Sequence, residues 1–320
     1  MPTVLESCVV MLEGQEGGTY DDILRIARRS EALGFGAVFR SDHWLPIMGA
    51  RSLDATDAWT TLAGLARDTT RIRFGTLVSP MTFRHPSQLA KIAATIDQMS
   101  GGRVEIGFGT GWYEAEHAAY GLRFPPLGER FDILEEALQI CTSLWSEGST
   151  TFEGKHFSLK DAPGLPKPVQ RPLPVIVGGR GPKRTADLTA RFAHEYNTGG
   201  DLDEWTRRCG NVRAACERIG RDPESVVHSW FGPTIVGHDE ADALRRAQQR
   251  MEHSSATGDV RAWLDDLATR NLMFGSASQV AEQVVALRER GASRWHFQVV
   301  PHPDDDMLEL LAKEVAAKAG

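Results

Sequence analysis

The sequence contains few cysteines, no long apolar run and no excess of positive charge, and each absence excludes a class of protein. Four cysteines are spread over 320 residues without CxxC spacing, which argues against a disulfide framework or a paired-cysteine redox centre. No apolar stretch reaches the roughly 18 residues that a membrane-spanning helix needs, and no signal peptide is evident. We therefore expect a cytoplasmic protein with reduced thiols and no membrane partner.

Basic residues are also outnumbered by acidic ones. The chain has 36 Lys and Arg against 43 Asp and Glu, a formal net charge of -7 at pH 7. It lacks the basic surface that binds phosphate backbones, so a nucleic-acid partner is not expected. The ten histidines show no HExxH or paired Cys/His spacing, so we expect no metal site.

What the sequence does contain is a regular alternation of short β-branched runs with amphipathic helical stretches. Strands followed by helices in strict alternation imply right-handed crossovers and parallel strands, which form a (β/α)8 TIM barrel or an open doubly wound sheet. Eight strands favour the barrel. The predicted strands are 3–12, 36–43, 71–79, 103–111, 173–179, 194–199, 225–237 and 293–300.

Two insertions interrupt this alternation within what we expect to be a single domain, residues 1–320. After strand 4, residues 112–126 are predicted to form an irregular loop, and residues 150–163 alternate around Gly154 as in a β-hairpin. After strand 7, one or two helices are expected between residues 238 and 272.

Polar and glycine residues gather at the C-terminal ends of the predicted strands. In a parallel barrel this rim carries the active site, because the loops that follow the strands meet there. We therefore expect one site built from several strand ends. These ends are SDHW (41–44), GTLVSP (75–80), GFGTGW (107–112), GGRG (178–181) and YNTGG (196–200).

The histidine of SDHW is the first candidate for chemistry. His43 follows Asp42, and imidazole transfers protons near neutral pH. An Asp-His pair also occurs in ordinary turns, so its place at a strand end is what favours the functional interpretation. We expect His85, at a helix start, to satisfy local backbone and His117 to be a solvated surface group.

Two glycine-rich strand ends are candidates for ligand binding. GFGTGW lacks the GxGxxG spacing of a dinucleotide loop, because Trp112 occupies the third glycine position and no helix is predicted directly after it. Its bare backbone still allows a flat ring to approach. GGRGPKRT (178–185) precedes a predicted helix whose free N–H groups, with Lys183 and Arg184, suit an anion. A plain turn explains the same residues equally well.

Longer stretches resemble a known family. GFGAVFRSDHW (34–44), residues 71–140, HFSLKDAPGLPKPVQRPLPVIVGG (156–179) and residues 275–300 are similar to the bacterial luciferase-like superfamily of flavin and deazaflavin oxidoreductases. The likeness extends over almost the whole chain. In detail the chain resembles the actinobacterial branch usually assigned to the deazaflavin coenzyme F420.

The resemblance implies a tricyclic ring lying over the strand ends. It implies a bulge behind the ring with a non-prolyl cis peptide at Thr76–Leu77, and it implies that His43 donates or accepts a proton beside Asp42. The residues that it assigns to cofactor binding are Thr76, Leu77, Ser79, Gly109, Thr110, Gly111, Gly178, Gly179 and Gly181.

One position departs from the family pattern. Relatives that oxidise sugar phosphates carry a second acid, Glu, where this chain has Trp112. Glu114 and Glu116 are close in sequence but not equivalent, so sugar phosphate oxidation is not expected. Trp112 and Trp44 are instead predicted to line an apolar substrate pocket.

The resemblance therefore implies an oxidoreductase that transfers a hydride between F420 and a small organic substrate. An FMN-dependent two-component monooxygenase, served by a separate flavin reductase, is the alternative. A cofactor-free binding or partner subunit is a third interpretation. The resemblance also implies a homodimer.

Overall fold

The computed structural model describes residues 2–269, 271–300 and 304–320. Its strands are β1 Cys8–Leu12, β2 Ala37–Arg40, β3 Arg73–Pro80, β4 Val104–Gly109, β5 Thr150–Glu153, β6 Ser158–Ala162, β7 Val175–Gly178, β8 Glu195–Thr198, β9 Val227–Gly237, β10 Met273–Ser276 and β11 Arg294–Val299. Its helices are α1 Tyr20–Leu33, α2 Ala58–Asp68, α3 Pro86–Ser100, α4 Glu114–Ala119, α5 Leu127–Trp145, α6 Arg184–Phe192, α7 Leu202–Arg218, α8 Glu240–His253, α9 Val260–Ala268, α10 Ala277–Glu289, α11 Asp305–Leu310 and α12 Ala316–Ala319. None of the helices in these ranges is long and apolar enough to cross a membrane.

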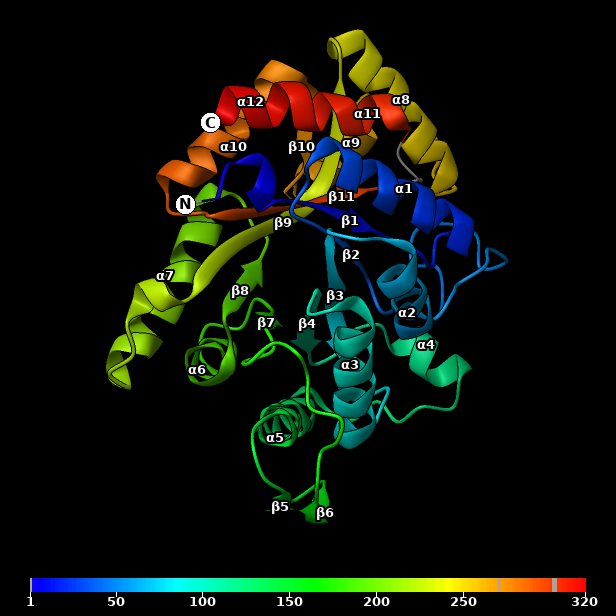
Figure 1. Cartoon of the computed structure of the whole chain (residues 1–320). Coiled ribbons are helices and arrows are strands. Elements are labelled where there is room, and N and C mark those ends of the chain that lie inside the picture. The colour runs from blue at the N-terminus through cyan, green and yellow to red at the C-terminus, as the bar shows by residue number, and fades with distance from the viewer. Residues whose placement is uncertain (1, 270, 301–303) are drawn as a thin grey trace.

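Parallel strands close into a ring with helices packed outside it (Figure 1). Among the described residues the ring runs β1-β2-β3-β4-β7-β8-β9-β11 and returns to β1. Cys8 to Leu12 of β1 pair with Trp295 to Val299 of β11, so the first and last barrel strands lie side by side. The predicted (β/α)8 barrel is confirmed.

Capping side chains, proline and glycine set the ends of the helices. The Thr19 hydroxyl and the Asp22 side chain form a capping box at the start of α1, and α1 ends at Gly34 with φ +96°. His85 caps α3 by accepting from the backbone N–H of Ser87, with Pro86 at the first helical position. The predicted local role of His85 is confirmed.

Two hydrophobic layers hold the barrel together. The larger lies between the ring and its helices, where the helical apolar faces cover the outward side chains of the strands. The smaller fills the barrel interior and consists of Val9, Met11, Ala37, Phe39, Leu77 and Ile176, with Val78 and Phe231 packed against it. The interior is therefore a packed core, and ligands have access only at the rims.

Below this core, at the N-terminal ends of the strands, lies a group of charged side chains that we call the lower-rim cluster: Glu105, Glu195, Arg294 and His296. Arg294 binds Glu105 and Glu195 at 2.5 and 2.6 Å, and the His296 Nε2 lies 2.8 Å from Glu195. All four side chains are largely buried. The N-terminal rim of a barrel normally serves stability, so this cluster is a structural feature.

The insertions agree in part with the prediction. The hairpin is present as β5 and β6, but α4 is a helix where an irregular loop was predicted, and Figure 1 shows it as a separate short helix. A six-residue helix is too short to show a period in sequence, and tertiary contacts decide it. The prediction also missed β10, which pairs with the far end of β9 after that strand leaves the ring.

Candidate active site

His43 and Glu116 form a hydrogen-bonded pair at the C-terminal rim. His43 follows the end of β2, and its Nδ1 lies 2.8 Å from the Glu116 Oε1. The Glu116 Oε2 accepts the backbone N–H of Trp44 at 3.0 Å. The Glu116 side chain is 1% exposed and that of His43 is 14% exposed. Within the described residues the His43 Nε2 makes no hydrogen bond, so it is the ring nitrogen available to a ligand.

The surroundings of His43 favour its protonated form. Burial lowers the pKa of an imidazole, but the hydrogen bond and the charge of Glu116 outweigh this effect and raise the pKa of His43 above 6.5. Glu13 and Asp42 add negative charge in the same direction. The arrangement can therefore accept a proton at Nε2, hold it near neutral pH and return it.

Glu116 is the functional residue that the sequence did not identify. It lies in α4, and the helix turns its carboxylate toward the end of β2, 73 residues earlier in the chain. The composition of residues 114–119, with its alanines and glutamates, favours a helix. The sequence could therefore have predicted the helix, but it could not show that Glu116 bonds to His43.

His117, the next residue, corrects a prediction. It is fully buried, so the expectation of a solvated surface group is wrong. Its ring packs against Phe83 and Phe124, with centroids 5.1 and 4.6 Å away. The reason is the helical geometry of α4, which turns Glu116 and His117 toward different neighbours.

Asp42 is fully buried, and both of its carboxylate oxygens accept hydrogen bonds. Arg84 binds it with two nitrogens, at 2.6 and 3.1 Å, and the Ser79 hydroxyl donates at 2.7 Å. Trp59 donates in turn to the Ser79 oxygen at 3.0 Å. A bidentate guanidinium pair of this kind fixes geometry. Asp42, Arg84 and Ser79 therefore join the ends of β2 and β3, and no oxygen of Asp42 faces a ligand.

A bulge interrupts the pairing of β3 with β4. Thr76 pairs with Ile106 and Ser79 with Phe108, so Leu77 and Val78 stand opposite a single residue of β4. The cis peptide lies between Leu77 and Val78, and the prediction of Thr76–Leu77 is wrong by one residue. Thr76 is still held in the ladder, so the irregular peptide follows Leu77.

Three glycines make room for the Val78 side chain. A Cβ at Gly107, Gly109 or Gly178 would lie 2.8, 2.5 or 2.8 Å from a methyl carbon of Val78, closer than real contacts allow. Val78 is half-buried and packs against the top of the barrel interior. Gly109 and Gly178, both predicted to bind a cofactor, therefore also have a packing role.

The turn after β7 has the form of an anion cradle. A Cβ at Gly181 would lie 2.7 Å from the Thr185 Oγ1, and one at Gly179 would lie 3.1 Å from the Thr185 Cγ2. The N-cap of α6, Lys183, makes no side-chain capping bond, so the first N–H groups of α6 lack that partner. Bare backbone at an uncapped helix N-terminus fits the phosphate of a flavin or deazaflavin.

The two predicted pocket tryptophans differ in their surroundings. Trp112 is 62% exposed, and its ring meets that of His43 edge-on at a centroid distance of 5.7 Å. Trp44 is half-buried and packs on Phe83 at 4.7 Å, with the Arg84 guanidinium 5.8 Å from its ring. Trp112 offers an open apolar face beside the His43 imidazole, whereas Trp44 supports the loop beneath it.

The remaining predicted residues divide in the same way. Thr76 is fully buried, and its hydroxyl oxygen lies 3.1 Å from that of Ser79. Leu77 belongs to the barrel interior. Thr110 and Gly111 are partly exposed on the turn after β4, and Gly111 has φ +74°, a conformation that favours glycine. The turn is thus open to a ligand, while Thr76 supports the bulge.

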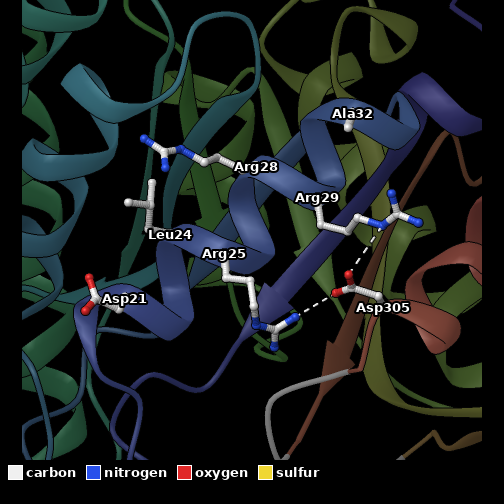
Figure 2. A pocket seen from close by; sticks show the side chains of 7 residues that line it. All are labelled: Asp21, Leu24, Arg25, Arg28, Arg29, Ala32 and Asp305. Carbon is white, nitrogen blue, oxygen red and sulfur yellow. Dashed lines mark hydrogen bonds and ion pairs between the residues drawn. The ribbon is translucent and has the colours of Figure 1, made fainter.

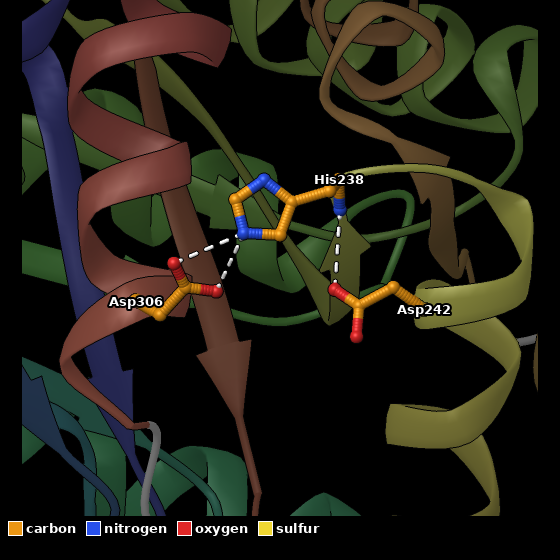
Figure 3. Close-up of side chains that lie close together, drawn as sticks. All are labelled: His238, Asp242 and Asp306. Atoms are coloured by element: carbon orange, nitrogen blue, oxygen red, sulfur yellow. Dashed lines mark hydrogen bonds and ion pairs between the residues drawn. The ribbon is translucent and has the colours of Figure 1, made fainter.

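Two further groups of polar side chains share no residue with this site. Figure 2 shows a hollow on the outer face of α1, where Arg25 pairs with Asp305 at 2.7 Å. Figure 3 shows His238, Asp242 and Asp306 close together. Arg246 binds both carboxylates, at 3.1 and 2.5 Å, and so already supplies the positive charge that a metal ion would bring.

Comparison with known proteins agrees with this arrangement. The family model described as luciferase-like monooxygenase matches residues 7–294. The chain is 37% identical to the F420-dependent glucose-6-phosphate dehydrogenase of Intrasporangium calvum, over 88% of this chain and 89% of that protein.

Solved structures share the fold. An F420-dependent secondary alcohol dehydrogenase, in complex with an F420-acetone adduct, superposes with a TM-score of 0.83 at 20% identity and covers 100% of both chains. The oxygenating constituent of 3,6-diketocamphane monooxygenase of Pseudomonas putida, in complex with FMN, superposes with a TM-score of 0.70 at 20% identity, covering 93% of each chain. The barrel, the bulged third strand and the match along most of the sequence lead to one conclusion: the chain belongs to the luciferase-like monooxygenase family.

Proposed function

We propose that the protein is an oxidoreductase that transfers a hydride between coenzyme F420 and a small organic substrate, with His43 moving the accompanying proton. The observation that carries the proposal is the His43–Glu116 pair at the strand ends, with the Nε2 of His43 free. The phosphate cradle after β7 lies on the same rim. The F420-dependent relative at 37% identity supports the choice of cofactor.

The residues present fit such a cofactor. Gly179, Gly181 and the N–H groups at the start of α6 would hold its phosphate. Val78, Gly109 and Gly111 would contribute side-chain and bare backbone surface for binding its ring. When bound, F420 supplies a carbon centre that accepts or gives up a hydride and does not usefully activate oxygen.

The protein's own part in the reaction is proton transfer. As the hydride leaves an alcohol carbon, the His43 Nε2 accepts the hydroxyl proton, and Glu116 stabilises the resulting imidazolium through Nδ1. In the reverse direction the imidazolium returns the proton to the carbonyl oxygen. Asp42 acts as a positioning residue, because Arg84 and Ser79 occupy its oxygens.

The surroundings of Trp112 indicate the chemical class of the substrate. Its exposed indole face lies beside the His43 ring and offers apolar surface at the position where the family resemblance places a carboxylate in sugar phosphate oxidising relatives. We therefore propose a small alcohol or ketone whose apolar body contacts Trp112 as the substrate.

A binding titration tests the cofactor. Purified protein titrated with F420 and, separately, with FMN is expected to bind F420 at micromolar or lower Kd, measured by fluorescence quenching. Binding of FMN alone would overturn the F420 assignment, and binding of neither would favour a cofactor-free subunit. Loss of F420 absorbance as F420 is reduced, with isopropanol or with glucose-6-phosphate as the hydride donor, then separates the two substrate classes.

Substitution of Gly181 by Ala tests the phosphate cradle. The new Cβ would lie 2.7 Å from the Thr185 Oγ1, so the turn or the Thr185 side chain must shift. Because the added methyl group also occupies the bare backbone of the cradle, we expect cofactor Kd to rise on the order of tenfold. Gly210→Ala is the control, because a Cβ there meets nothing within 4 Å. Equal Kd values for the two variants would remove the cradle from the binding site.

Substitution of Glu116 by Gln tests the pair by its pH dependence. Without the carboxylate charge, the pKa of His43 is expected to fall toward 6.5, so the acid limb of kcat for alcohol oxidation moves to lower pH. The raised pKa of His43 contributes stability that is present below 6.5 and lost as pH rises through the folded value. Glu116→Gln should therefore destabilise the fold more at pH 6 than at pH 9. A pH-independent loss of stability would contradict this.

The alternative is an FMN-dependent monooxygenase supplied by a flavin reductase. It is favoured by the FMN complex of a structure with this fold, and it predicts substrate oxidation only when reduced FMN and oxygen are both supplied. For either cofactor we propose a cytoplasmic homodimer, which size-exclusion chromatography with light scattering would test.

A further inference from the structure

His117 is a buried titratable residue for which the proposed mechanism has no use. It is fully buried although it lies in a short surface insertion. It directly follows Glu116, so whatever fixes His117 also fixes the backbone from which the Glu116 side chain extends. Burying an imidazole is costly unless its nitrogens are bonded.

Both ring nitrogens of His117 have partners. Nδ1 lies 2.8 Å from the carbonyl oxygen of Tyr113, and Nε2 lies 2.7 Å from the Thr82 hydroxyl. A carbonyl only accepts, so Nδ1 carries the hydrogen and donates to it. In the neutral ring, Nε2 then accepts from Thr82. The Thr82 bond ties α4 to the segment that follows β3, whereas the Tyr113 bond lies within the first turn of α4.

The helix has little else to hold it in place. α4 contains six residues, and its N-cap, Tyr113, makes no side-chain capping bond. So short a helix is not stable alone. Apart from Glu116 and His117, two tyrosines at the ends of α4 bond to another segment of the described chain. The Tyr113 hydroxyl donates to the Pro46 carbonyl oxygen at 3.5 Å, and the Tyr120 hydroxyl donates to the Trp44 carbonyl oxygen at 3.2 Å.

The glycine turn is part of the same contact. A Cβ at Gly111 would lie 3.0 Å from the Thr82 Oγ1 and 3.7 Å from the His117 Cε1. The turn after β4, the segment after β3 and α4 therefore meet at His117. Its ring packs at tilted angles against Phe83 and Phe124, and the His117 side chain is fully buried.

We propose that His117 and Thr82 are positioning residues that hold Glu116 against His43. The inference deepens the proposed function, on which its catalytic consequence rests. According to this inference, the inserted helix α4 supplies the second acid of the site, Glu116. The hydrogen bond between Thr82 and His117 keeps that acid in place.

Other charges act on His43 as well, and they stay in place in the variants used here. Glu13 follows β1 and Asp42 follows β2, and both favour the protonated imidazole. Asp42 is fixed by Arg84 and Ser79, and Glu13 accepts from Gln15. A change in the titration of His43 on altering Thr82 or His117 therefore reports the position of Glu116.

The experiment compares two disrupting variants with two controls. Thr82→Val keeps the shape and removes the hydroxyl, and His117→Phe keeps a ring between Phe83 and Phe124 and removes both hydrogen bonds. Thr82→Ser restores a hydroxyl. Thr95→Val is the matched control, since Thr95 is exposed on α3 and bonds only within that helix.

The first readout is the titration of the His43 ring in full-length protein without added ligand, followed by NMR and assigned with His43→Asn. We expect the proton affinity of His43 to fall on the order of tenfold in Thr82→Val and His117→Phe. It should recover in Thr82→Ser and stay unchanged in Thr95→Val. The second readout is kcat and KM for F420 reduction by isopropanol, where kcat should fall with KM little changed.

An unchanged His43 titration in Thr82→Val would overturn the proposal, even if the variant were less thermostable, because a purely structural role lowers Tm alone. If His117→Phe fails to fold, Thr82→Val decides. Failure of the proposed function is separate: it would appear as unchanged turnover in His43→Ala while the effect of Thr82 on the His43 titration persisted.

Discussion

Replacing His43 with Ala is expected to lower kcat by about 10²- to 10⁴-fold, the usual contribution of a positioned acid or base, while cofactor Kd stays within a factor of about two. Only kcat should change strongly, because the His43 ring lies apart from the residues predicted to bind the cofactor phosphate. Its Nδ1 is bound to Glu116, its Nε2 is free, and none of its contacts involves the cradle after β7. The variant removes the proton acceptor without touching the phosphate site. The measurement is F420 reduction followed by absorbance, together with F420 binding followed by fluorescence.

The size of this effect depends on Glu116. A neutral imidazole held by a carboxylate has its tautomer fixed, with the hydrogen on Nδ1 and the lone pair on Nε2. When Nε2 takes up a proton, the negative charge of Glu116 stabilises the imidazolium that forms. His85→Ala is the matched control, because His85 is exposed and bonds to the backbone of Ser87 at the start of α3. Turnover in His43→Ala equal to that in His85→Ala would remove His43 from the mechanism.

Much of the upper rim could be predicted from the sequence, because it depends on local signals. Strand periodicity and the glycines after it placed the ends of β2, β4 and β7 on one face, and the barrel follows from strict alternation. The bulge in β3 was expected at the right strand, but its cis peptide lies one residue further on, at Leu77–Val78. A register shift depends on pairing with β4, which no local pattern encodes.

What could not be predicted depends on contacts between distant residues. Glu116 acquires its role from His43, 73 positions away, and α4 acquires its position from Thr82. Asp42 followed the family pattern beside His43, yet Arg84 and Ser79 occupy its oxygens. A carboxylate next to a histidine in sequence is therefore a weaker guide to a catalytic pair than a carboxylate brought to it by an insertion.

The two rims of the barrel use similar residues for different purposes. At the lower rim, Arg294 lies between Glu105 and Glu195, and its guanidinium is 5.3 Å from the ring of Phe39 in the barrel interior. Burial would raise the pKa of Glu195, but Arg294 and His296 lower it to about 2. Each rim has a histidine with one unbonded ring nitrogen, but His43 at the upper rim is partly exposed, whereas His296 at the lower rim is fully buried beside carboxylates already bound to a guanidinium.

Replacing Arg294 with Met is accordingly expected to cost about 3–5 kcal/mol of unfolding free energy at pH 7, because two buried carboxylates lose their shared partner. The lowered pKa of Glu195 means that the pairing stabilises the fold above pH 4.5 and loses its effect as pH falls toward 2. The deficit of the variant, measured by denaturant unfolding, should therefore stay constant above pH 4.5 and shrink as pH falls from 4.5 toward 2. Arg290→Met is the control, since Arg290 pairs at 3.6 Å with an exposed Asp203 and should lose under about 1 kcal/mol. Equal losses in the two variants would show that the lower-rim cluster does not stabilise the barrel.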